Sequence, residues 1–112
     1  MRVYVRLKRH VIRVERRAKR REAKRLATDV KYAITKAFAR LGRTAQAMRV
    51  AYCESTHNRF AVNGQYRGLF QLGRHHWHRL RGLPYYHAYA NARAAASIVA
   101  ADGGWGQWSC RP

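Results

Sequence analysis

The stretch Asn91-Ala-Arg-Ala-Ala-Ala-Ser-Ile-Val-Ala-Ala-Asp-Gly-Gly104 decides the fold class of this chain. Alanine has the highest helix propensity of the amino acids, so the alanine-rich segment from Asn91 to Ala101 predicts a helix. Asp102-Gly103-Gly104 is typical of a helix end followed by a turn. The stretch therefore favours a mainly α fold.

The residues around this stretch indicate further short helices separated by turns. We expect a small α-rich domain with little or no sheet. Its other predicted segments are a helix from Thr44 toward Glu54, turns over residues 56–68, a short helix over 73–80 that Gly82-Leu83-Pro84 ends, and an aromatic loop over 105–110.

The first part of the chain differs sharply in composition. Residues 1–43 hold 16 Lys or Arg and 3 acidic residues, whereas residues 44–112 hold 8 Arg, no Lys and 2 acidic residues. This change predicts a basic helical extension over 1–43 and a separate domain over 44–112. The extension's apolar residues recur at helical spacing in two stripes: Leu7, Val11, Val14 and Ala18, then Leu26, Val30, Ile34, Ala37, Phe38 and Leu41.

The ends of these two predicted helices have their own signals. Thr28 or Asp29 could cap the second helix, and Gly42 suits its C-terminus. Because Val3, Val5 and Leu7 also alternate with polar residues, a short strand at the start of the chain is an alternative.

A formal charge of +19 predicts polyanionic surroundings for this chain of 112 residues. Nucleic acid, anionic wall polymers and anionic lipid all fit residues 1–43, and a merely solvated helix face is the alternative. The sequence has no zinc-finger spacing and no aromatic RNA-binding motif. It also has no apolar run long enough for a transmembrane segment and no recognisable signal peptide.

Two cysteines, Cys53 and Cys110, bracket most of the second part of the chain. A disulfide between them would contribute about 4 kcal/mol by restricting the unfolded chain, and it would imply an oxidising compartment. Two buried free thiols are the alternative. Without further Cys or His partners nearby, a structural zinc site is not expected.

Glu54 is one of only two acidic residues after residue 43, the other being Asp102. It follows Cys53 at the predicted end of a helix, beside aromatic and apolar residues. Desolvation there would raise the pKa of the carboxyl, and a protonated carboxyl can donate a proton to a glycosidic oxygen. An ordinary surface glutamate is the alternative.

Several segments, taken in order, resemble the lytic transglycosylase and resuscitation-promoting-factor branch of the lysozyme-like superfamily over residues 44–110. The family has a Glu-Ser pair at a helix end, an Asn-Pro-x-Ala-Val turn and a Gly-Leu-(Met/Phe)-Gln segment. Here the expected proline after Asn58 is Arg59. The matching segments are Tyr52-Cys53-Glu54-Ser55, Asn58, Ala61-Val62-Asn63-Gly64, Tyr66-Arg67-Gly68-Leu69-Phe70-Gln71, Asn91-Ala92-Arg93-Ala94-Ala95 and Trp105-Gly106-Gln107-Trp108-Ser109-Cys110.

The resemblance implies a small lysozyme-like domain that cleaves peptidoglycan between N-acetylmuramic acid and N-acetylglucosamine. Glu54 would be the catalytic acid, and then the base toward either the muramoyl 6-hydroxyl or water. The resemblance also implies that Cys110 bridges back to Cys53. The second carboxylate of the common glycosidase scheme is missing, because Asp102 better suits a helix-end role. A one-carboxylate mechanism without cofactor or metal is therefore expected.

Further residues are candidates for substrate binding by resemblance or by chemistry. Amides at positions 71 and 91 would hydrogen-bond sugar groups, whereas the aromatic side chains would either stack on sugar faces or fill the core. Gly68 would allow close backbone approach. The candidates are Ser55, Tyr66, Gln71, Trp77, Asn91 and Trp105.

The cluster of His75, His76 and His78 suggests a metal site. However, their spacing does not place three imidazoles on one helix face, so a solvated or sugar-facing cluster is expected instead.

Two other classes of function compete with a peptidoglycan-cleaving enzyme. One is a catalytically inactive wall-binding or virion structural protein with a polyanion-binding arm, and the other is a basic nucleic-acid-binding protein. A wall substrate and a disulfide predict an extracytoplasmic location, in the cell wall or secreted. A phage lysin or a virion-associated enzyme would also reach that substrate without a signal peptide.

Overall fold

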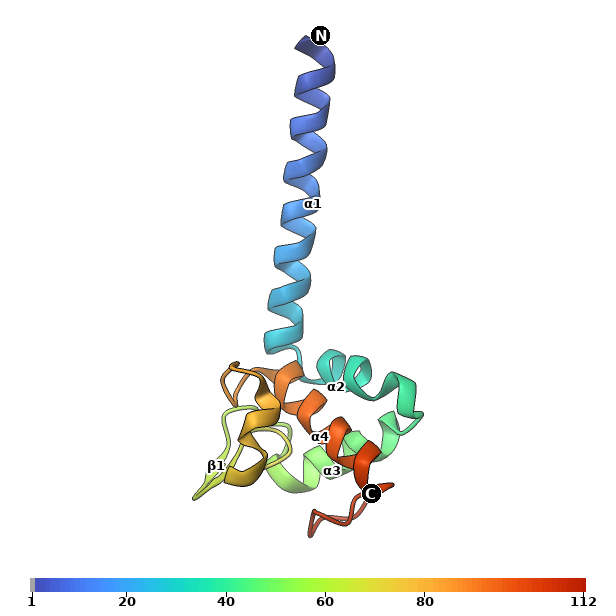
Figure 1. Ribbon diagram of the computed structural model, residues 1–112, viewed down its shortest axis with the longest axis vertical. Coiled ribbons are helices and arrows are strands. Elements are labelled where there is room, and N and C mark those ends of the chain that lie inside the picture. The colour runs from blue at the N-terminus through green and yellow to red at the C-terminus, as the bar shows by residue number, and fades with distance from the viewer. Residues whose placement is uncertain (1) are drawn as a thin grey trace.

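The structure is a computed structural model that describes residues 2–112, and it is mainly helical as the sequence predicts (Figure 1). Its only sheet within those residues is a two-stranded antiparallel hairpin that pairs Val62 with Arg67. In chain order the elements are α1 (Arg2–Thr28), α2 (Val30–Phe38), the 3₁₀ helix η1 (Ala39–Leu41), α3 (Thr44–Ser55), β1 (Val62–Asn63), β2 (Tyr66–Arg67), the 3₁₀ helix η2 (Arg74–Leu80) and α4 (Ala88–Asp102).

The alanine-rich stretch forms α4, which runs through the centre of the body and ends at Gly103 in the left-handed region. The helix begins three residues earlier than expected. His87 provides the cap that the sequence analysis missed, since its Nδ1 accepts a hydrogen bond from the Ala90 N–H at 3.1 Å. Small alanine side chains on several faces let neighbouring elements pack closely around this helix.

Helix α1 projects away from the body, and none of its residues is buried (Figure 1). The alternative of a short strand at Val3–Leu7 is wrong, because the helix begins at Arg2. Asp29 ends α1 and caps α2, as predicted, by accepting a hydrogen bond from the Tyr32 N–H at 3.1 Å.

Helix α2 packs into the body, and its Tyr32 also contacts the base of the projecting helix. Its residues Ala33, Ile34 and Phe38 are fully buried in the same hydrophobic core as α3 and α4. The change in composition near residue 43 therefore does not coincide with a change in packing. The apolar stripe of α2 needs a partner, and α4 provides it.

The C-terminal loop closes the core over the other elements. The ring of Trp105 stacks on Phe38 and Phe70, with centroids 5.5 and 6.2 Å apart. A disulfide joins Cys53 at the end of α3 to Cys110, so the alternative of two free thiols is wrong. No helix within residues 2–112 has the length and apolarity to cross a bilayer.

Candidate active site

Glu54 lies in the last turn of α3, and its carboxyl is half-buried. The helix ends immediately after it, because Thr56 and His57 adopt left-handed backbone angles with φ of 53° and 60°. Burial raises the pKa of the Glu54 carboxyl above its usual value, and a backbone hydrogen bond from Cys110 partly opposes this. Since desolvation is the larger effect, the site holds the Glu54 proton more tightly than water does.

The carboxyl of Glu54 faces a cavity of about 350 Å³ between the β-hairpin and the C-terminal loop. Glu54 is the only acidic residue in the lining. The complete lining is Glu54, Asn63, Tyr66, Gln71, Gln107, Trp108 and Ser109.

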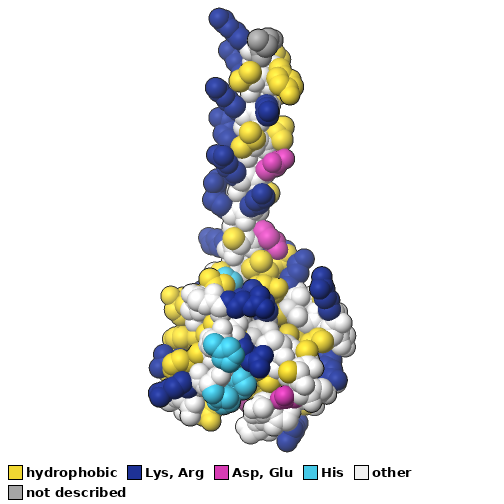
Figure 2. Space-filling view, viewed as in Figure 1, with side chains coloured by type: hydrophobic (Ala, Val, Ile, Leu, Met, Phe, Trp, Pro, Cys, Tyr) yellow, Lys and Arg dark blue, Asp and Glu magenta, His cyan; other side chains and the backbone are white. Residues whose placement is uncertain are grey.

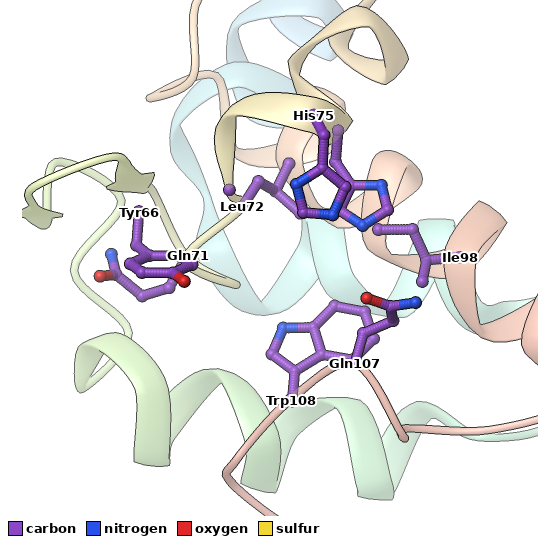
Figure 3. A pocket seen from close by; sticks show the side chains of 9 residues that line it. Tyr66, Gln71, Leu72, His75, Ile98, Gln107 and Trp108 are labelled. Atoms are coloured by element: carbon purple, nitrogen blue, oxygen red, sulfur yellow. The ribbon is translucent and has the colours of Figure 1, made fainter.

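A second cavity of about 210 Å³ continues from the first, because four residues line both: Tyr66, Gln71, Gln107 and Trp108. We call the two together the groove. Figure 3 shows its second part, with His75 opposite Gln107 and Trp108, the pair Tyr66 and Gln71 at one end, and Ile98 at the other. The groove is therefore an elongated site with amides, imidazoles and aromatic rings on its walls.

His75 and His76 form the histidine wall of the groove, with ring centroids 4.0 Å apart. Burial lowers the pKa of His76, and the neighbouring charge of His75 lowers it further. A neutral imidazole can both donate and accept a hydrogen bond, which suits sugar hydroxyls. Within residues 2–112, no three His, Cys, Asp or Glu side chains gather as metal ligands would.

Of the predicted binding residues, the structure brings Tyr66 and Gln71 together with Glu54. Tyr66 is exposed at the start of β2 and lines both parts of the groove. Gln71 has a left-handed backbone, with φ of 50°. Its Nε2 donates to the carbonyl oxygens of Gly68 at 3.0 Å and Ala61 at 3.2 Å. These bonds fix the orientation of the Gln71 side chain at the groove.

Asn91 does not line the groove, contrary to our expectation. Its side chain is fully buried and serves the backbone of two loops. Its Oδ1 accepts from the Phe70 N–H at 2.9 Å, and its Nδ2 donates to the carbonyl oxygens of Arg67 and Tyr85, each at 3.1 Å. A buried amide that meets three backbone groups holds the loop that carries Gln71.

Ser55, Trp77 and Trp105 also lie outside the groove lining, and each has a local partner. The Ser55 hydroxyl donates to the Ala51 carbonyl oxygen at 3.0 Å. Trp105 is buried in the core and donates from Nε1 to the Gln46 side chain at 2.9 Å. Trp77 donates to the Leu72 carbonyl oxygen at 3.0 Å. Trp105 therefore matches the core alternative, whereas Trp77 is partly buried against the outside of the core.

Sequence reasoning missed four residues of the cavity that Glu54 faces: Asn63, Gln107, Trp108 and Ser109. Trp108 is mostly buried and donates to the Phe70 carbonyl oxygen at 2.7 Å, and it lines both parts of the groove. The disulfide at Cys110 was the signal that could have found three of them. Because the disulfide joins Cys110 to Cys53, the residue before Glu54, it must bring residues 107–109 close to the Glu54 carboxyl.

Comparison of the chain with protein-family models, characterised proteins and solved structures gives no match. The residues of the groove and their geometry therefore carry the functional argument.

Proposed function

We propose that this protein is a peptidoglycan-cleaving glycosidase in which Glu54 acts as the catalytic acid. The observation that carries the proposal is a half-buried carboxyl with a raised pKa, facing a groove lined by aromatic rings and amides. A protonated carboxyl in such a groove can reach the leaving oxygen of a bound glycan. The substrate class comes from the resemblance of residues 44–110 to lytic transglycosylases.

In the proposed reaction, Glu54 donates its proton to the oxygen between N-acetylmuramic acid and N-acetylglucosamine. The bond from the muramoyl C1 to this oxygen then breaks, and the N-acetylglucosamine side leaves as an alcohol. The Glu54 carboxylate next removes a proton from the attacking hydroxyl. If the muramoyl 6-hydroxyl attacks, the product is a 1,6-anhydro sugar, and if water attacks, it is a reducing end.

The absence of a second carboxylate from the groove lining supports a one-carboxylate mechanism. Asp102, the other acidic residue after residue 43, is exposed at the end of α4 and does not line either cavity. Without an enzyme carboxylate to stabilise the positive charge at the muramoyl C1, the acetamido group of the substrate is the available neighbour.

The amides of Gln71 and Gln107 would bind sugar acetamido and hydroxyl groups, and the rings of Tyr66 and Trp108 would contact sugar faces. The disulfide between Cys53 and Cys110 fits an enzyme that works outside the cytoplasm, in the wall, secreted or on a virion.

Mass spectrometry of muropeptides tests this proposal. Purified peptidoglycan is incubated with the wild-type protein and with Glu54→Gln, and the soluble products are identified. We expect anhydro-ended or reducing-ended fragments from the wild type and none from the variant. Glycan that stays intact with both proteins, although both bind it, would instead indicate an inactive wall-binding protein. Cleavage by both proteins would exclude Glu54 as the acid.

A further inference from the structure

Helix α1 is a surface that the proposed function leaves without a role. Its 27 residues project from the body, and none of them is buried. The helix carries 12 Lys or Arg residues but only two acidic ones, Glu15 and Glu22. The groove lies on the body, so the chemistry proposed for Glu54 requires nothing from α1.

The first five turns of α1 have an apolar stripe along one face. Its members follow helical spacing, and the larger side chains are well exposed, with Leu7 at 61% and Val11 at 52%. Figure 2 shows hydrophobic side chains along one side of the helix and Lys or Arg along the other. The stripe consists of Val3, Tyr4, Leu7, Val11, Val14 and Ala18.

The opposite side of α1 is mostly cationic, with Val5 and Ile12 between its arginines. At 100° per residue, Arg6, Arg9, Arg13, Arg16 and Arg20 share the side of the helix away from the stripe. A helix of low overall hydrophobicity with a strong division between apolar and cationic faces has the pattern of helices that lie in a membrane interface.

We propose that α1 binds an anionic lipid surface, lying along it with the apolar stripe inserted between the headgroups. The basic residues that border the stripe, Lys8, Arg17 and Lys19, would then contact lipid phosphates, and this attraction adds to the burial of the stripe. This binding is independent of the proposed activity of Glu54.

A second copy of the chain is a poorer partner for the stripe. In a coiled coil, the core positions after Tyr4, Leu7, Val11, Val14 and Ala18 would be Arg21 and Arg25. The apolar repeat thus covers little more than two heptads, fewer than a stable coiled coil needs. Two such helices would also bring their excess positive charges together.

Nucleic acid is a poorer partner because it would use only the cationic face. Phosphate contacts by Lys and Arg would leave the stripe in water and gain nothing from its burial. An anionic lipid surface uses the stripe as well as the basic residues that border it.

The base of α1 is attached to the body. The Tyr32 hydroxyl donates to the Glu22 carboxylate at 2.7 Å, and the Arg25 guanidinium lies 3.7 Å from the centre of the Tyr32 ring. The stripe, which ends at Ala18, lies beyond this attachment. Binding of the stripe to lipid would therefore hold the body close to the membrane without rearranging its core.

Sedimentation with lipid vesicles tests the proposal on the full chain. The probes are vesicles of mixed phosphatidylglycerol and phosphatidylcholine, and vesicles of phosphatidylcholine alone, at about 0.15 M salt. The test variant is Leu7→Ser/Val11→Ser, which alters the stripe. The matched control is Val5→Ser/Ile12→Ser, which removes two exposed apolar residues from other positions of the same helix and leaves the charge unchanged.

We expect the wild type to bind the anionic vesicles and to bind the neutral ones much more weakly. Leu7→Ser/Val11→Ser should weaken binding about tenfold or more, since two apolar side chains lose their burial, and the control should weaken it far less. Unfolding of the body should be unchanged in both variants, because α1 buries no residue.

Three results would overturn the proposal. The first is wild-type protein that does not sediment with anionic vesicles. The second is equal binding by the stripe variant and the control, which would mean that charge alone acts and would favour nucleic acid or another polyanion. The third is light scattering that shows a wild-type dimer which Leu7→Ser/Val11→Ser converts to a monomer, because the stripe would then be an interface between copies.

Discussion

The side-chain oxygen of Asn91 accepts a hydrogen bond from the backbone N–H of Phe70 at 2.9 Å, across 21 residues of sequence. The same amide donates to the carbonyl oxygens of Arg67 and Tyr85. Asn91 therefore attaches the loop that ends in Gln71 to the central helix α4. Because Gln71 lines the groove beside Glu54, this buried amide sets the shape of the site without touching it.

Replacing the Asn91 side chain should destabilise the folded protein. Asn91→Ala leaves three buried backbone groups without their partner, and we expect the free energy of unfolding to fall by about 3 kcal/mol or more. Urea denaturation measures this loss. The matched control is Asn63→Ala, at an exposed asparagine of the hairpin, where we expect a change below about 0.5 kcal/mol. Equal stability of the two variants would contradict the role given to Asn91.

Gly68 provides a second test of the same loop. Its φ is +80°, and an added Cβ would collide with the Asn91 side-chain nitrogen and lie 2.7 Å from the Tyr85 carbonyl oxygen. Gly64 also has a positive φ, of +61°, but a Cβ there would meet nothing within 4 Å. Both alanine variants incur the left-handed backbone cost of about 1–2 kcal/mol. Gly68→Ala alone adds a collision, of about 1–3 kcal/mol.

Thermal unfolding of the two glycine variants separates these contributions. We expect a clearly lower midpoint for Gly68→Ala than for Gly64→Ala. Matching midpoints would show that the close approach of Asn91 to Gly68 is not important for stability.

The disulfide should account for a large part of the stability of the body. Replacing both Cys53 and Cys110 with serine should lower the free energy of unfolding by about 4 kcal/mol, because the unfolded chain gains freedom. Denaturation in urea with and without a reductant measures the effect. Reduction should destabilise the wild type by a similar amount and leave the double variant unchanged. A wild type insensitive to reduction would be evidence against this bridge.

The raised pKa of Glu54 predicts a specific dependence of stability on pH. The folded state holds the Glu54 proton more tightly than the unfolded chain, so the stabilising contribution is complete below the ordinary pKa of 4.5. It is lost as the pH rises through the folded-state pKa. Glu54→Gln cannot ionise, so its free energy of unfolding relative to the wild type should increase with pH.

Urea unfolding of wild type and Glu54→Gln at about pH 4 and about pH 8 measures this difference. The free energy of unfolding of Glu54→Gln, relative to that of the wild type, should be greater at the higher pH. A variant that loses stability relative to the wild type over this range would mean that the ionised carboxylate is the stabilised form.

The helices were predictable from the sequence because their signals are local. The alanine run of α4 and the cap at Asp29 depend only on residues close in sequence. The partner of α2 was not predictable in this way, because its buried stripe is met by α4, far along the chain. The change in amino-acid composition predicted a boundary at residue 43, but the hydrophobic core includes residues on both sides of this position.

The groove was only partly predictable for the same reason. Glu54, Tyr66 and Gln71 were identified by their motif and lie together in the structure. The same motif reasoning placed Asn91 at the groove, but polar side chains in a small domain also satisfy buried backbone groups. Gln107 and Trp108 reach the groove through tertiary packing and the disulfide, which no local pattern describes.

The rate of glycan cleavage by two matched carboxyl variants tests the central claim most directly. Glu54→Gln and Asp102→Asn each change one acid to its amide, but only Glu54 lines the groove. With both variants folded and disulfide-bonded, we expect Glu54→Gln to lose at least about 100-fold in rate, as removal of a general acid does. Asp102→Asn should cleave at close to the wild-type rate. A Glu54→Gln protein that releases soluble muropeptides as fast as Asp102→Asn would contradict the account.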